Sequence, residues 1–244
     1  MKIIISPAKK MNIRNDDFTY ESKAVFLDKT TYLMNLIKGL SLEDKKNLWK
    51  CNDKLLELNI KRFNDMELDS CLTPAVYSYE GLQYQYMAPH VMDYNSLNFL
   101  KDNLRILSAF YGILSPFDGV VPYRLEMQAK LKGVLDLYDF WKDDIYKELT
   151  KDDHIILNLA SKEYSKVIEP YLSDKDTFVT CVFGEMKDGK VVQKGTFAKM
   201  ARGEMVNYLA SINAKSVEDA KGFNRLDFSF KEELSSDKEY IFIR

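Results

Sequence analysis

The side chains in this sequence that could do chemistry are mainly cations, and several stand where a short apolar run ends. Lys9 and Lys10 follow the run at 2–5 and its Ser-Pro turn, while Asn158 and Ser161 close the run at 154–159. Both runs have the composition of buried strands, and open α/β sheets usually bind ligands at strand ends. Cations gathered at such an edge would bind phosphate or nucleic acid. The residues that we expect to form this site are Lys9, Lys10, Arg124, Asn158, Ser161, Lys199 and Arg202.

Lys199 and Arg202 belong to a helix that the pattern predicts from about 196 to 212. Being three residues apart, they share one face of that helix. Ala201 and Gly203 beside them leave room for a backbone or a ligand to approach closely. The alternative, which the sequence leaves open for each cation, is an ion pair with a nearby acid. The pairs to consider are Arg124 with Glu126, and Arg202 with Glu204 or Asp227.

Several familiar kinds of site have no support in the sequence. It lacks GxGxxG, GxxxxGK[ST], GxSxG and HExxH, so it predicts no bound cofactor and no metal. The two histidines, His90 and His154, have no ligand partners at metal-site spacing, which favours a hydrogen-bonded structural role for each. Three cysteines with 20 and 110 residues between them fit neither a metal half-site nor a disulfide framework. Cys181 falls inside an expected strand, where a redox thiolate is disfavoured.

The segment at 73–90 carries four tyrosines, and its composition predicts an irregular aromatic segment. Tyr79, Tyr84 and Tyr86 have two interpretations. They could stack on the bases of a single strand, as aromatic side chains do in single-strand binders. The favoured interpretation is that they belong to the core or a lid, with their hydroxyl groups hydrogen-bonded.

Composition and charge describe a globular chain with no bulk attraction to a polyanion. The 244 residues are 46% hydrophobic, and 35 Lys plus Arg against 37 Asp plus Glu give a net charge of −2. Any affinity for nucleic acid must therefore come from local clustering of charge. No repeat, low-complexity linker or apolar stretch of about 20 residues is present. We expect one domain over 1–244, no membrane segment and a cytoplasmic location.

Apolar periodicity predicts strands interleaved with helices, and hence an α/β mixed (α+β) fold with a central mixed sheet flanked by helices. Asp188-Gly189 predicts a hairpin between 177–186 and 190–193. The stretch at 114–122, with two prolines and a glycine, is expected to be a loop. Further strands are expected at 104–109, 226–230 and 240–243, and further helices at 22–39, 43–49, 53–64, 95–103, 138–149 and 161–172.

Six stretches of the chain together resemble the YaaA family of bacterial peroxide-stress proteins. They occur in the family's order: SPAKKM at 6–11, TPAVYSYEGLQYQYM at 73–87, RILSAFYGILSPFDGVVPYRLEMQAKL at 105–131, LYDFWKDDI at 137–145, NLASKEY at 158–164 and KMARGEMVNYL at 199–209. The long block containing PYRLEM and the stretch containing ARG are the most specific. Carried over by position, the family's motif residues fall on Lys9, Arg124, Asn158, Ser161, Lys199 and Arg202.

The resemblance implies a single mixed α/β domain of unusual topology with a positively charged cleft. It also implies a cytosolic protein that limits unincorporated iron during hydrogen peroxide stress, and a helix-hairpin-helix-like element associated with DNA binding. The expected helices at 43–49 and 53–64 are the counterpart of that element. Their connection lacks the usual GxG turn, whose backbone amides approach a phosphate.

Two functions of different classes stay open at this point. The first is DNA binding, mainly through phosphate contacts in the basic cleft. The second is an enzyme acting on a nucleotide or a nucleic-acid base, in which Arg124 and Arg202 hold a phosphate or other small anionic ligand and Glu126 or Glu80 serves as acid or base. A cavity sized for one small molecule would favour the enzyme, and an open trough would favour DNA. Direct iron binding is disfavoured because the histidines and acids show no metal-ligand spacing.

Overall fold

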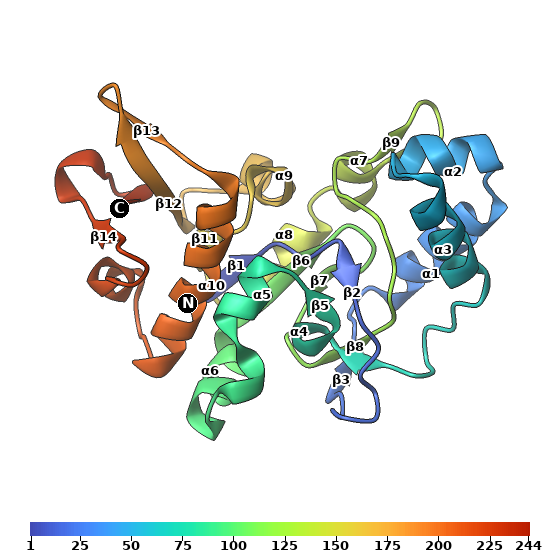
Figure 1. The fold of residues 1–244 in the computed structure, drawn as a ribbon, viewed down its shortest axis with the longest axis horizontal. Helices are drawn as coiled ribbons and strands as arrows, with labels where there is room; N and C mark the ends of the chain where they lie inside the picture. The colour runs from blue at the N-terminus through green and yellow to red at the C-terminus, as the bar shows by residue number, and fades with distance from the viewer.

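The centre of the molecule is an eight-stranded sheet (Figure 1). Its strands are β1 (Lys2–Ile5), β6 (Leu104–Ser108), β7 (Gly112–Leu114), β11 (Ile155–Leu159), β12 (Thr177–Lys187), β13 (Lys190–Val192), β14 (Ser229–Phe230) and β15 (Glu239–Ile243). They lie in the order β14-β15-β12-β11-β1-β6-β7, and β13 pairs with β12. This computed structural model describes all 244 residues.

The sheet is mixed, with a parallel centre and antiparallel margins. Neighbours from β15 through β12, β11 and β1 to β6 run parallel. β7, β13 and β14 each pair antiparallel with their neighbour. The runs in β1 and β11 are almost wholly buried, as expected for parallel strands covered on both faces. The predicted mixed α/β fold with a central mixed sheet is confirmed.

The predicted hairpin is also confirmed. Lys187 pairs with Lys190, so the loop consists of Asp188 and Gly189 alone. Both residues have positive φ, 51° and 73°. A two-residue hairpin of this kind needs that conformation, which Asp and Gly accept more readily than most residues.

Three small sheets hold the segments around the central sheet. β2 (Lys10–Met11) pairs with β5 (Tyr79–Glu80), and β9 (Lys130–Leu131) pairs with β10 (Leu135–Asp136). β8 (Asp118–Val120) lies between β3 (Ser22–Lys23) and β4 (Thr73–Pro74). The first pairing matters for the site, because it places Lys10 directly opposite Glu80.

The predicted late helix is α10 (Gly195–Ser211), and it packs closely along α5 (Leu82–Met87). Gly203 permits this approach, because a Cβ atom there would lie 2.1 Å from the backbone oxygen of Gln83. α6 (Tyr94–Asn103) also contacts α10 and covers β1 and β6. The small residue noted beside Arg202 in the sequence thus accommodates a neighbouring backbone.

The expected helix pair is present at the other end of the molecule. α1 (Leu27–Gly39), α2 (Leu42–Trp49) and α3 (Asp53–Asn64) lie far from the β12–β13 hairpin along the long axis (Figure 1). Ser41 and Asn52 cap α2 and α3, accepting hydrogen bonds from backbone amides three residues on. α1 begins at Leu27, so the expected start at 22 is wrong, because Ser22 and Lys23 pair with β8 instead.

Two predicted helices are interrupted. The helix expected at 138–149 is split into α7 (Leu137–Trp141) and α8 (Asp144–Leu149), because Lys142 between them has a φ of 46°. The helix expected at 161–172 ends early as α9 (Lys162–Ser165), followed by the 3-10 turn η2 (Glu169–Tyr171). Pro170 prevents the α-helix from continuing, since it lacks the amide hydrogen that an α-helix would bond to the Lys166 oxygen.

Three other predictions of local structure need correction. The stretch at 73–90 is ordered into α4 (Ala75–Ser78), α5 and η1 (Pro89–Val91) in addition to its short strands, because Tyr79 and Tyr84 are buried in the core. The loop expected at 114–122 contains β8. The strand expected at 226–230 covers only β14, because Leu226 and Asp227 have φ of 57° and 63°. The chain ends in β15, after the 3-10 turns η3 (Val217–Gly222) and η4 (Glu232–Leu234).

None of the helices combines the length and the apolar character that crossing a bilayer requires.

Candidate functional site

A cavity of about 390 Å³ opens at the carboxyl ends of β1 and β11. Ser6 follows β1, Ser161 follows β11, and both line the cavity. The chain leaves β1 toward β6 on one side and returns through β11 on the other, so the strand order reverses between β1 and β11. Such a reversal leaves a crevice outside the strand ends, where open α/β sheets bind ligands.

The cavity gathers six of the seven residues expected to form the site. They come from the segments after β1 and β11, from the stretch after β8 and from α10: Lys9, Lys10, Arg124, Ser161, Lys199 and Arg202. Segments that are far apart in the sequence therefore converge on one hollow. Five cationic side chains face it against three acidic ones, Glu80, Glu126 and Glu163.

Asn158 is the exception. Its amide donates to Thr180 Oγ1 at 3.1 Å, and its Oδ1 accepts from the Ala160 amide at 2.9 Å. It lines a larger neighbouring hollow of about 1020 Å³, which Arg202 also borders. Asn158 thus braces the turn after β11 and lies outside the cavity that holds the other six.

Three of the cavity's cations are neutralised by its acids. Lys9 Nζ lies 2.7 Å from Glu126 Oε2, and Arg124 Nη2 lies 3.3 Å from Glu126 Oε1. Lys10 Nζ lies 2.8 Å from Glu80 Oε2. The local ion pair weighed for Arg124 is therefore present. Lys9 and Lys10 remain 63% and 68% exposed at the mouth of the cavity.

Lys199 and Arg202 make no ion pair and no side-chain hydrogen bond within the chain. The partners considered for Arg202 are wrong, because Glu204 pairs with Arg225 at 3.1 Å. Burial lowers the pKa of Arg202, and burial raises the pKa of the adjacent Cys181 thiol. The neutral thiol offers no countercharge, so the half-buried guanidinium has no compensating charge within the chain.

The cavity also collects polar atoms that lack partners. Five buried side-chain nitrogen or oxygen atoms in the protein have no hydrogen bond, and three belong to residues that line this cavity. These three are Arg124 Nε, Arg202 Nε and Gln83 Nε2. Buried polar groups are normally satisfied, so a cluster of unsatisfied donors indicates a place that a ligand or ordered water would complete.

The acidic residues that face the cavity also differ in whether they have charged partners. Hydrogen bonds from Lys10 and Asn12 lower the pKa of Glu80, which keeps that carboxylate ionised. Glu163 has no ion pair, and burial, with the charge of Glu126 as a further cause, raises its pKa. Its Oε1 accepts from the Gln128 amide at 3.2 Å. Glu163 was not among the acids considered from the sequence.

The tyrosines form one wall of the cavity and part of the core. Tyr84 is buried and donates to the Ser6 backbone oxygen at 3.0 Å. Tyr79 OH and Tyr123 OH lie 2.9 Å apart, and burial raises the pKa of Tyr123 to about 12. The interpretation of Tyr79 and Tyr84 as hydrogen-bonded core residues is confirmed. Tyr86 is half-buried.

Comparison with known proteins agrees with the motifs. The family model described as peroxide stress protein YaaA matches residues 1–234. The chain belongs to the YaaA family of peroxide-stress proteins. It is 50% identical to a UPF0246 protein of Desulfitobacterium hafniense, over 100% of this chain and 98% of that one. It is likewise 50% identical to one from Agathobacter rectalis (100% and 99% covered) and 49% identical to one from Pediococcus pentosaceus (100% and 98% covered).

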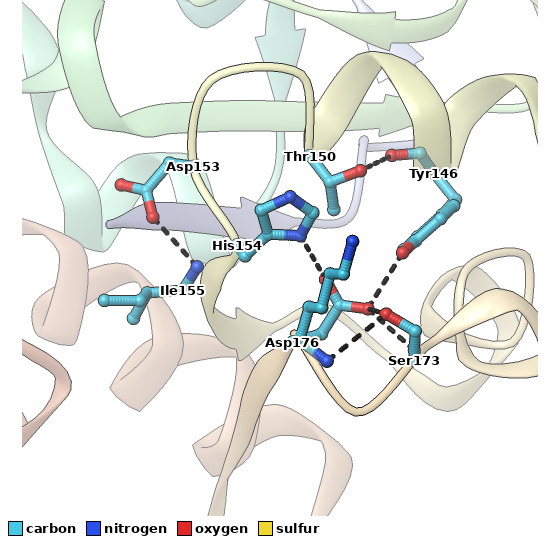
Figure 2. A network of polar contacts seen from close by, with 8 residues as sticks. Tyr146, Thr150, Asp153, His154, Ile155, Ser173 and Asp176 are labelled. Atoms are coloured by element: carbon cyan, nitrogen blue, oxygen red, sulfur yellow. Dashed lines mark hydrogen bonds and ion pairs between the residues drawn. The ribbon is translucent and has the colours of Figure 1, made fainter.

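The histidines of this YaaA-family chain lie outside the cavity. His154 Nδ1 lies 2.7 Å from Asp176 Oδ1, inside a closed network of polar contacts (Figure 2). This agrees with the structural role predicted for His154, while His90 is exposed. Nowhere in the chain do three or more His, Cys, Asp or Glu side chains gather in a way that could hold a metal ion.

Two YaaA-family motif stretches contained residues that the sequence reasoning passed over. Glu163 stands two residues after Ser161, inside the stretch at 158–164, and Gln83 lies inside the stretch at 73–87. The available signal was their position next to expected site residues. Their roles depend on which partners folding leaves them, and no spacing in the sequence reveals that.

Proposed function

We propose that the cavity binds a phosphorylated small molecule of about nucleotide size and that this binding serves the protein's role in peroxide stress. Arg202 carries the proposal, because its half-buried side chain has no ion pair and its Nε is fully buried without a hydrogen bond. A phosphate group would supply both. Lys199 is one turn away on α10 and would add a second positive charge.

The size of the cavity favours a small ligand over a duplex. Small-molecule sites usually enclose about 300–1,000 Å³, and this one encloses about 390 Å³. Its wall combines the tyrosines Tyr84, Tyr123 and Tyr164 with the amide of Gln83. Aromatic faces and a free amide donor suit a nucleobase or another planar polar group.

Calorimetric titration with nucleoside 5′-monophosphates and with inorganic phosphate tests the proposal. Arg202→Met should weaken phosphate binding at least about 10-fold, because a hydrogen bond to a charged group contributes roughly 1.5–3 kcal/mol. Lys10→Met is the matched control, since Lys10 lies at the same cavity but is already paired with Glu80. Equal affinity in wild type and Arg202→Met would rule out Arg202 as the phosphate ligand.

DNA binding is the second candidate, and the exposed Lys9, Lys10 and Lys199 at the mouth support it. For six phosphate contacts, affinity should fall by about three orders of magnitude between 50 and 200 mM salt. The double variant Lys199→Ala, Arg202→Ala should lower the affinity and flatten that dependence. An unchanged salt slope would remove both residues from a DNA interface.

The cellular part of the proposal is that the protein limits unincorporated iron when hydrogen peroxide is present. Cells lacking the protein should contain more unincorporated iron during peroxide exposure, as measured by electron paramagnetic resonance after chelation. Complementation with wild type should reverse the increase. Complementation with Arg202→Met should fail if the cavity carries this role, and full reversal by that variant would separate iron from the cavity.

A further inference from the structure

We propose that Glu163 is the proton donor of a hydrolytic reaction in this cavity, in which water cleaves the glycosyl bond of a phosphorylated ligand. This inference rests on the proposed function, because the ligand is the one held by Arg202 and Lys199. It adds a reaction, a bond and an acid to that binding site. The evidence is the unequal pairing of the acids that face the cavity.

Glu163 is the only carboxyl group at the cavity that forms no ion pair. Glu80 is paired with Lys10, and Glu126 is paired with both Lys9 and Arg124. Glu163 lies in the first turn of α9, immediately after the strand end that supplies Ser161. Its Oε1 accepts a hydrogen bond from the backbone amide of Gln128 at 3.2 Å.

The surroundings of Glu163 favour its protonated form. The charged and titratable groups that face it are Glu126 and Lys9, together with Tyr138 and Tyr164. Burial disfavours the ionised form first, and the negative charge of Glu126 adds to that effect, so the pKa of Glu163 is raised. A carboxyl group with a raised pKa keeps a proton to donate closer to neutral pH.

Glu126 is the second carboxyl group of this arrangement. Two cations touch it, Lys9 at 2.7 Å and Arg124 at 3.3 Å, whereas no ion pair involves Glu163. Two carboxyl groups in different electrostatic surroundings, facing a single cavity, are the arrangement that enzymes use to cleave glycosyl bonds.

Water is the only reactant that this reaction needs besides the ligand. Glu163 donates its proton to the leaving nitrogen or oxygen, the bond from that atom to the anomeric carbon breaks, and the electron pair stays with the leaving atom. Glu126, the second carboxyl group at the cavity, faces the positive charge that develops on the sugar. Water then attacks the anomeric carbon, and the Glu163 carboxylate accepts the proton that the water loses. The products are the free sugar phosphate and the protonated leaving group.

The test is chromatographic detection of released base from ribo- and deoxyribonucleoside 5′-monophosphates between pH 5 and 8. We expect wild type to release base, and Glu163→Gln to reduce kcat at least about 100-fold, as loss of a general acid does. The KM should stay within about threefold, since the phosphate contacts come from α10. Glu57→Gln, an exposed change on α3, is the matched control.

Further measurements keep the outcomes distinct. Glu163→Asp should recover part of the rate with a shifted pH profile, and thermal melting checks that both variants fold. A single-stranded oligonucleotide tests whether the nucleotide is free or part of a strand. Nucleotides that bind wild type but release no base, or an unchanged rate in folded Glu163→Gln, would overturn the hydrolysis and leave the binding proposal standing. Failure of every nucleotide and of phosphate to bind would overturn both.

Discussion

Two polar clusters sit at opposite edges of the parallel sheet and differ in how completely their groups are paired. At the amino ends of β11 and β12, Asp176 accepts hydrogen bonds from His154, Tyr146 and Ser173, and its side chain is fully covered (Figure 2). At the carboxyl ends of β1 and β11, Arg202 has no partner. In the first, the closed cluster, the chain itself supplies the partners of Asp176, and in the second, the open cluster, it supplies none for Arg202.

The two clusters have opposite effects on the stability of the fold. A satisfied buried carboxylate strengthens the fold, because each of its hydrogen bonds is present only in the native state. An unpaired buried cation opposes folding, because it loses water without gaining a countercharge. Under the proposed function, the phosphate of the ligand would supply the missing countercharge.

The largest expected effect is at the closed cluster. Asp176→Ala should lower the free energy of unfolding by about 3 kcal/mol, because it removes several hydrogen bonds to a charged acceptor and leaves their donors unpaired. Urea denaturation measures it. Asp174→Ala, an exposed neighbouring acid, is the control and should change stability by less than about 0.5 kcal/mol. Similar values for the two variants would contradict the contrast.

The same carboxylate predicts an acid dependence. Burial would raise the pKa of Asp176, but the bonds from His154, Ser173 and Tyr146 outweigh burial and lower it from 3.8 to about 2. The stabilisation is therefore complete above pH 3.8 and disappears as the pH falls through about 2. The stability difference between wild type and Asp176→Ala should shrink over that interval. A difference that stayed constant down to pH 2 would show that the network does not hold the ionised form.

The next effect concerns the contact that positions Arg202. Gly203→Ala places a Cβ atom 2.1 Å from the Gln83 backbone oxygen, so α5 and α10 must separate. We expect a loss of about 2 kcal/mol in unfolding free energy, as for other overpacked sites. Gly195→Ala, at the start of the same helix with nothing within 4 Å of the added atom, should be neutral or slightly stabilising. Unchanged stability in Gly203→Ala would show that α5 and α10 can separate at this contact without cost.

The open cluster should respond in the opposite direction. Arg202→Met removes an unpaired, half-buried charge and keeps much of the side-chain volume, so the free energy of unfolding should rise, by about 1 kcal/mol. Thermal melting of the ligand-free protein measures the change. A variant less stable than wild type would mean that Arg202 holds the fold together, and the contrast between the clusters would then fail.

The smallest effect is expected at the mouth of the cavity. Lys10 is 68% exposed, and such ion pairs contribute little. Lys10→Ala should change the free energy of unfolding by less than about 0.5 kcal/mol, measured by the same denaturation. A change above 1 kcal/mol would show that the Lys10–Glu80 pair stabilises the fold as strongly as a buried contact does.

Sequence periodicity foretold much of the fold where apolar patterns are strong. The strands β1, β6, β11 and β12 and the helices α2, α3, α6 and α10 stand close to where they were expected. The errors fall where one residue overrides the local pattern, as at Lys142 and Pro170. They also occur where core packing orders a segment whose composition predicts irregular structure, as in the tyrosine-rich stretch that contains α5.

The candidate site, like the fold, could be predicted only in part from the sequence. That cations cluster at strand ends could be predicted, because a strand end and its following residues are adjacent in sequence. Asn158 was placed in the site on the same reasoning, and the structure uses it to brace a turn. Glu163 was missed because its distinguishing feature is the absence of a cation partner, which sequence spacing does not encode.

The sequence by itself determined the family, the mixed α/β class and which cations could meet at the edge of the sheet, since these depend on local propensity and motif identity. Only the tertiary structure decided which of those cations are neutralised. Pairing is a matter of a few ångströms between segments seventy or more residues apart, as for Lys10 with Glu80 and Lys9 with Glu126. The electrostatic energy of a buried charge depends on those distances and on the water that folding removes, so Arg202 and Glu163 became distinct only in the folded chain.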